Sequence, residues 1–93
     1  MPEIAHREFD KPVYVVSGRH NTVIRPVKTT AEACDWLLNK WPAGCAGEKH
    51  LAARMACMQV LEGQRKVALA RKAFSGAAVE AQILVDEKAY GRR

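Results

Sequence analysis

Six apolar residues in the C-terminal third of the sequence recur with helical spacing. Successive members lie three or four residues apart, except for one adjacent pair, and on a helix turning about 100° per residue they share one sector of roughly 100°. The pattern continues through Ser75 and Gly76 without losing phase, so we expect an unbroken helix over about Gln64 to Ala81. The residues that we assign to its buried face are Val67, Ala70, Phe74, Ala77, Ala78 and Ala81.

The composition is that of one small globular domain. The chain has 93 residues, of which 48% are hydrophobic, and a formal net charge of +5, which allows one modest core without a staple. The three cysteines are an odd number, which favours free thiols in a reducing compartment. The sequence contains no apolar run long enough to span a membrane, and its first residues lack the apolar region of a secretory signal. We therefore expect a cytoplasmic protein without a membrane partner.

The N-terminal part predicts a β-hairpin. Val13 to Val16 are β-formers that follow Pro12, which is tolerated at the first position of a strand. Turn residues occupy 17–21, and 22–25 form the returning strand, which Pro26 either ends or places at an edge. We interpret 1–11 as a loose arm, 12–87 as one domain and 88–93 as a frayed basic tail.

Two further helices are predicted between the hairpin and the C-terminal helix. Thr29 and Glu32 have the spacing of a capping box, so a helix begins near residue 30, and Pro42 ends it near Trp41. A second helix covers about Glu48 to Leu61, and Gly63 is suited to the position just after its C-terminal end. The apolar residues of this helix lie on all sides of its axis, which predicts that other elements cover it on several sides. The buried face assigned to the first helix is Thr30, Cys34, Leu37, Leu38 and Trp41, with Trp36 on the opposite side.

The segment after the last helix is ambiguous. Leu84 would extend the helical pattern, but three consecutive large aliphatic residues, two of them β-branched, favour a strand over Ile83–Asp86. With that strand, the fold class is α+β: a small antiparallel sheet, made of the hairpin and a C-terminal strand, packs against three helices in the order ββαααβ.

A series of short motifs runs in order through most of the sequence. The motifs are Pro12-Val13, Glu32-Ala33, Trp41-Pro42, Gly47, Ala53, Cys57, Gly63, Ala70-Arg71-x-x-Phe74 and Ala77-Ala78-x-Glu80-Ala81. In this pattern the sequence resembles domain of unknown function family 982, a group of short alphaproteobacterial proteins, over roughly residues 9–86. One departure is Gln82, where the family pattern leads us to expect glycine at the end of the last helix. The resemblance implies a small α+β fold and brings no catalytic residues, substrate or cofactor.

Metal binding and thiol catalysis both have weak support. Cys45, His50 and Cys57 are separated by gaps unlike those of paired zinc ligands. Cys45 precedes a helix N-terminus and lies five residues from His50, but no orienting Asp or Asn stands beside the pair. We therefore expect neither a metal, a cofactor nor an enzyme active site.

The remaining features favour an interaction module. Trp36 lies off the buried face of its helix, so either a second layer covers it or it anchors a protein partner; unpaired sheet edges would also allow self-association. Our leading hypothesis is a non-enzymatic protein-interaction module, with a second copy as one candidate partner. The alternative is weak non-specific nucleic-acid binding, for which the candidate basic surface is Arg65, Lys66, Arg71, Lys72, Arg19 and Arg25.

Overall fold

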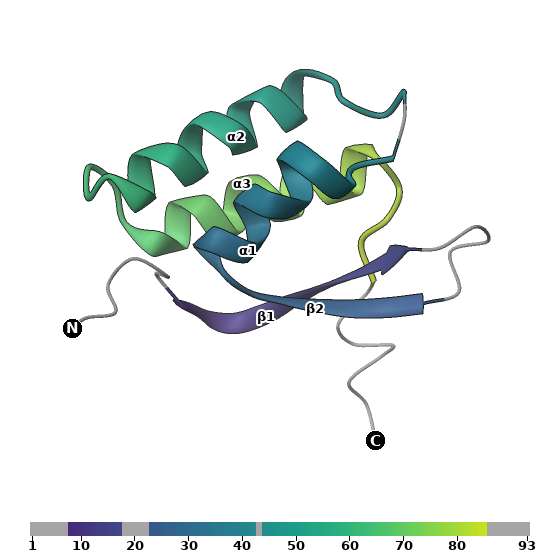
Figure 1. The fold of residues 1–93 in the computed structure, drawn as a ribbon, viewed down its shortest axis with the longest axis horizontal. Helices are drawn as coiled ribbons and strands as arrows, with labels where there is room; N and C mark the ends of the chain where they lie inside the picture. The colour runs from purple at the N-terminus through teal and green to yellow at the C-terminus, as the bar shows by residue number, and fades with distance from the viewer. Residues whose placement is uncertain (1–7, 18–22, 43, 86–93) are drawn as a thin grey trace.

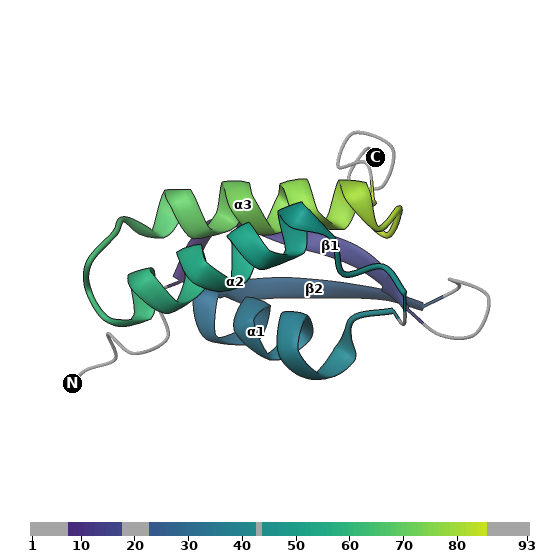
Figure 2. The same cartoon turned by 90° about the horizontal axis from the view of Figure 1, so that it is seen from above.

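The computed structural model describes residues 8–17, 23–42 and 44–85. Within them, helices cover one face of a two-stranded antiparallel sheet, so the chain has the predicted α+β class and two layers (Figure 1). Seen from above the helical layer, α2 and α3 run antiparallel and α1 lies on the other side of α2 (Figure 2). The elements in order are β1 (Glu8–Ser17), β2 (Val23–Thr29), α1 (Thr30–Asp35), the π-helical turn η2 (Trp36–Lys40), α2 (Glu48–Leu61) and α3 (Val67–Glu80).

Strand β1 begins earlier than Pro12, so the interpretation of 1–11 as a loose arm is wrong for residues 8–11. Glu8 pairs with Thr29, and the buried ring of Phe9 belongs to the core. The register shifts between Glu8 and Val13, and Pro12 lies in this irregular stretch, where a missing donor is tolerated. Residues 1–7 and 88–93 lie outside the described part of the chain.

Strand β2 continues through Pro26, so this proline lies within an edge strand and does not end it. Val13 pairs with Val27, and Val15 with Arg25. Val13, Val15 and Val27 are buried under the helices, as the alternation of side chains across a sheet requires.

The capping box at α1 forms with a shifted partner. The Glu32 amide donates to Thr29 Oγ1 over 3.0 Å, as predicted, whereas the Glu32 carboxylate accepts from the Lys28 amide at 2.7 Å instead of the Thr29 amide. The helical segment ends at Lys40, one residue before Trp41, because Pro42 disfavours helical geometry in the residue that precedes it.

The buried face of α1 and η2 agrees with the prediction at Thr30 and Leu37, which are buried, and differs from it at three other positions. Ala33 is fully buried and Leu38 is exposed, so the inward face is rotated towards residues that the assigned stripe left out. Trp36 follows Ala33 by three residues and therefore shares this face. Only 8% of Trp36 is exposed.

The apolar stripe predicted for the C-terminal helix is confirmed. Helix α3 runs without a break through Gly76, and Phe74, Ala77 and Ala78 are fully buried. The helix begins at Val67, later than Gln64, because the preceding residues form the turn after α2.

The segment after α3 lies antiparallel beside β1. Leu84 forms a single bridge with Val15, the Val16 amide donates to Ile83 O, and the Val85 amide donates to Tyr14 O, both over 2.9 Å. Within the described residues, the strand predicted over 83–86 is therefore present only as this bridge, and Asp86 lies outside them.

Candidate interaction surface

Helix α2 carries a row of large apolar side chains on its outer side. Leu51, Met55 and Met58 are 51%, 55% and 52% exposed, respectively. Their spacing of four and three residues places them on one face of the helix, and α2 is the element farthest from the sheet (Figure 1). We call these three residues the α2 row. The prediction that α2 is covered on several sides therefore holds for the sides that face α3 and α1 but is wrong for this outer side.

The inner face of α2 explains why its large residues remain outside. Ala53, Cys57 and Val60 are fully buried, and α2 packs chiefly against α3, whose own inward residues are mostly alanine. Small residues on both helices permit close approach, which leaves no interior space for leucine or methionine. Exposed rows of large apolar side chains are typical of binding surfaces. The apolar pattern on all sides of α2 predicts burial of the α2 row, although the difference in residue size between the two faces is a usable signal that the larger residues lie outside.

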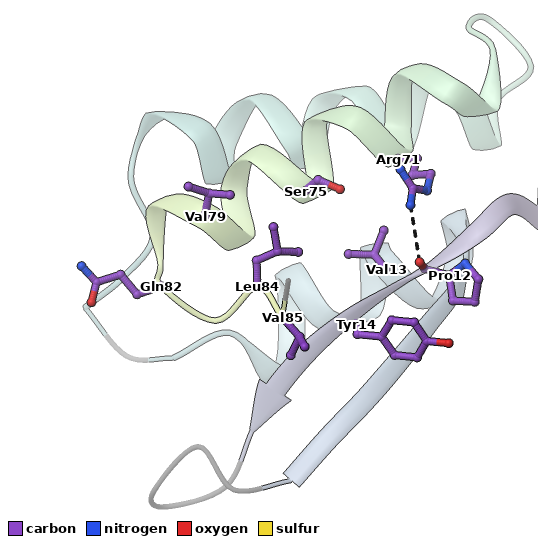
Figure 3. A pocket seen from close by; sticks show the side chains of 9 residues that line it. All are labelled: Pro12, Val13, Tyr14, Arg71, Ser75, Val79, Gln82, Leu84 and Val85. Carbon is purple, nitrogen blue, oxygen red and sulfur yellow. Dashed lines mark hydrogen bonds between the residues drawn. The ribbon is translucent and has the colours of Figure 1, made fainter. Parts of the chain in front are cut away.

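The outer edge of β1 is closed to further strand pairing. The bridge described above uses the backbone groups of Tyr14 and Val16. Further along the edge, Arg71 Nε donates to Lys11 O over 2.8 Å. Arg71 Nη2 lies 3.4 Å from Pro12 O (Figure 3). Because Pro12 has no amide hydrogen and its carbonyl faces Arg71, this stretch offers little to an incoming strand.

The outer edge of β2 is obstructed in a similar way at two of its outward positions. Tyr14 and Val16 direct their backbone groups away from β2, so their partners in the antiparallel ladder, Pro26 and Ile24, also point outwards. Pro26 lacks the donor, and the amide of Lys28, the next outward position, is bound by the Glu32 carboxylate. Edge-to-edge pairing is thus a poor route to self-association.

Trp36 is not available as a partner anchor in this structure. Its side chain is buried in the core cluster, with Lys40 Nζ 5.7 Å from the ring centroid. Arg25 of β2 lines the hollow beside it. The second layer considered in the sequence analysis, here the sheet under α1, accounts for this tryptophan.

The predicted basic residues do not form one face. Arg65 and Lys66 are exposed in the turn before α3, and Lys72 is exposed on that helix. Arg71 is half-buried and bound to the β1 backbone, while Arg25 lies across the molecule beside α1. Arg19 lies outside the described residues.

The buried His50 side chain makes contacts that hold neighbouring segments of the fold together. Its Nε2 lies 2.8 Å from Leu37 O, so this nitrogen carries the proton and satisfies a carbonyl at the end of the helical segment that precedes it. The ring of Trp41 lies 5.3 Å from that of His50 and 5.8 Å from that of Phe74, and Trp41 Nε1 donates to Cys45 O over 3.2 Å. These contacts join the loop after η2 to α2 and α3.

All three thiols are free. Burial, with a smaller contribution from the neighbouring Cys34, raises the pKa of Cys57 to about 12. Burial also raises the pKa of Cys34. A raised pKa disfavours the reactive thiolate. In the described part of the chain, no three His, Cys, Asp or Glu side chains are grouped so that they could hold a metal ion.

Comparison with known proteins identifies a family whose function is unknown. No described helix is long and apolar enough to cross a membrane. No curated protein and no solved structure matches the chain. The model of a family described as "Protein of unknown function (DUF982)" matches residues 11–85. This range includes the apolar stripe of α3, the α2 row and the residues that obstruct the outer edges of β1 and β2. The chain therefore belongs to this family of proteins of unknown function, DUF982.

Proposed function

We propose that this protein is a non-enzymatic protein-interaction module that associates with a second copy of itself through the α2 row. The observation that carries the proposal is the exposure of Leu51, Met55 and Met58, each more than half accessible on one helical face. Contiguous exposure of large apolar side chains destabilises an isolated monomer in water and favours association. The free state of all three thiols supports a cytoplasmic location.

The spacing of the row favours a second copy as the occupant. Leu51 lies four residues before Met55 and Met58 three residues after it. A two-fold axis near Met55 would therefore bring the row of one helix onto the row of an antiparallel partner, with each terminal side chain meeting the opposite end. Ala52, exposed beside the row, would let the two helices approach closely.

The scattered basic side chains support this choice over nucleic-acid binding. Arg71, one of the cations proposed for the phosphate backbone, already binds two backbone carbonyls, and Arg25 lies beside α1 rather than beside α3. Strong binding to nucleic acid needs many clustered phosphate contacts.

The proposal is tested by measuring mass against concentration. Sedimentation equilibrium from micromolar to millimolar protein should show a concentration-dependent mass, and Met55→Lys should reduce it to that of a monomer. Val79→Lys is a matched control, because Val79 is 58% exposed on α3 and lies outside the row. Circular dichroism establishes that both variants fold. A wild-type chain that remains monomeric at millimolar concentration, or equal effects of the two lysines, would contradict the proposal.

A further inference from the structure

A second surface lies between β1 and α3, on a different helix from the α2 row. Two hollows of about 500 and 460 Å³ adjoin there, and Arg71 and Ser75 line both. One hollow extends along α3 to Val79 and Leu84 (Figure 3), and the other extends back to Val67. Together they form a groove, which we call the β1–α3 groove.

The charge of the groove is positive. Lys11, Arg71 and Lys72 line it, against one carboxylate, that of Asp10. Arg71 is held by its bonds to β1, so its guanidinium is pre-oriented, and its Nη1 donors have no partner among the described residues. In that part of the chain, no carboxylate lies within ion-pair distance of Arg71. A fixed, half-buried guanidinium without a counter-ion favours a carboxylate ligand.

The walls of the groove are largely apolar. Val13 and Leu84 point from the strand side towards α3, and Val79 lies on the helix above them (Figure 3). A ligand that fits must therefore carry apolar groups as well as carboxylates. Since the 14 residues of α3 span about 21 Å, the groove has the length of about six residues of extended chain.

We propose that the β1–α3 groove binds an extended segment of a partner protein in which acidic and apolar side chains alternate. The carboxylates meet Arg71 and Lys72, and the apolar side chains pack on Val79 and Leu84. Because Pro12 and Arg71 close the β1 edge, the segment is held by its side chains rather than by strand addition. The inference does not depend on self-association, which uses the α2 row.

Charge argues against two other occupants. The chain's own residues 86–93 contain Asp86 and Glu87 but also Lys88, Arg92 and Arg93, so their net charge has the same sign as the groove. A nucleic acid would leave the apolar walls unused, and the three cations of the groove are fewer than the roughly six to ten phosphate contacts typical of tight binding.

The test uses the ¹⁵N-labelled full chain and three probes. These are a short acetylated peptide of alternating glutamate and leucine, its lysine–leucine counterpart, and a short oligothymidylate. We expect the glutamate–leucine peptide to shift amide resonances of α3 and β1, and added salt to weaken its binding. Lys72→Glu should raise its dissociation constant by about fivefold, whereas Lys49→Glu, an exposed charge reversal on α2 outside the groove, should leave it unchanged.

Several outcomes would overturn the inference. Equal binding of the lysine–leucine peptide, tighter binding of oligothymidylate, absence of binding, or shifts confined to other surfaces would each do so. If the peptide binds only after Asp86→Asn and Glu87→Gln, the chain's own carboxylates hold the groove, and the proposed partner is wrong. An equal loss in Lys49→Glu would show that net charge, and not the groove, governs binding.

Discussion

Replacement of Gln82 by glycine should stabilise the protein. Helices α2 and α3 end in the same hydrogen-bonded motif, in which the residue after the C-cap adopts positive φ. At α2 this residue is Gly63, with φ 83°, and at α3 it is Gln82, with φ 62°. The amide of Gln82 donates to Val79 O and that of Ile83 to Ala78 O. The motif at α3 is therefore complete, although glutamine occupies the position that favours glycine.

The expected gain in stability is the difference between two backbone contributions of opposite sign. A residue with a Cβ loses about 1–2 kcal/mol in the left-handed region, and glycine loses about 0.5–1 kcal/mol through its greater freedom in the unfolded chain. The side chain of Gln82 is exposed and makes no hydrogen bond within the described part of the chain, so its removal adds little. We expect a net gain of about 0.5–1 kcal/mol, or about 4 °C in Tm for a domain of this size.

Thermal and urea unfolding, followed by circular dichroism, measure this gain. Gln82→Ala is the control, because it removes the same side chain but keeps the Cβ, and it should be no more stable than the wild-type chain. Gly63→Ala reverses the change at α2 and should destabilise the protein by about 1 kcal/mol. If Gln82→Gly and Gln82→Ala have the same stability, the backbone argument is wrong.

Three further predictions concern other contacts. A Cβ at Gly47 would lie 2.9 Å from Glu80 Oε1, but this carboxylate is the far end of an exposed, flexible side chain that can turn away, so Gly47→Ala should change the free energy of unfolding by less than about 0.5 kcal/mol in the wild-type and Glu80→Ala backgrounds alike, as a double-mutant cycle measures. Thr29→Ala should lower the free energy of unfolding by about 1 kcal/mol, while Thr29→Ser retains the cap. Equal losses in the two variants would show that the hydroxyl cap does not stabilise α1. Because the pKa of Cys57 is raised from 9.0 to about 12, the folded chain keeps a proton that the unfolded chain releases, so stability should fall as the pH rises from about 9 towards 12, and Cys57→Ala should flatten this slope in urea titrations.

The parts of the fold that sequence alone predicts are those set by local signals. The α3 stripe, the Thr29 cap and the glycine after α2 each act over a few residues, so their outcome depends little on the rest of the chain. The expectation of glycine at position 82 comes from the family resemblance, but it too concerns a feature of a few residues. The backbone there adopts the glycine-like conformation although the residue is glutamine.

The features that sequence reasoning missed depend on contacts between distant segments. Phe9 lies in a polar stretch and becomes core only because β1 pairs with β2 from Glu8 onwards. Arg71 reads as a solvated charge until α3 is placed beside Lys11, 60 residues away. The α2 row could not be assigned to a side by periodicity, because both faces of α2 are apolar and only the size of the residues distinguishes them.

The obstructed outer edges of β1 and β2 limit the surfaces that a partner protein could bind. A two-stranded sheet has two exposed edges, and such edges invite uncontrolled strand pairing. Here each edge contains one proline, and in each case a side chain of a helix, Arg71 or Glu32, binds a backbone group that an added strand would need. With these backbone groups occupied at both edges, we expect any partner to be recognised through side chains. The helix–helix contact that we propose at the α2 row and the side-chain contact that we propose in the β1–α3 groove both agree with this constraint. Pro26→Val combined with Glu32→Ala should restore strand pairing at the β2 edge, seen as β-rich aggregation that the wild-type chain resists.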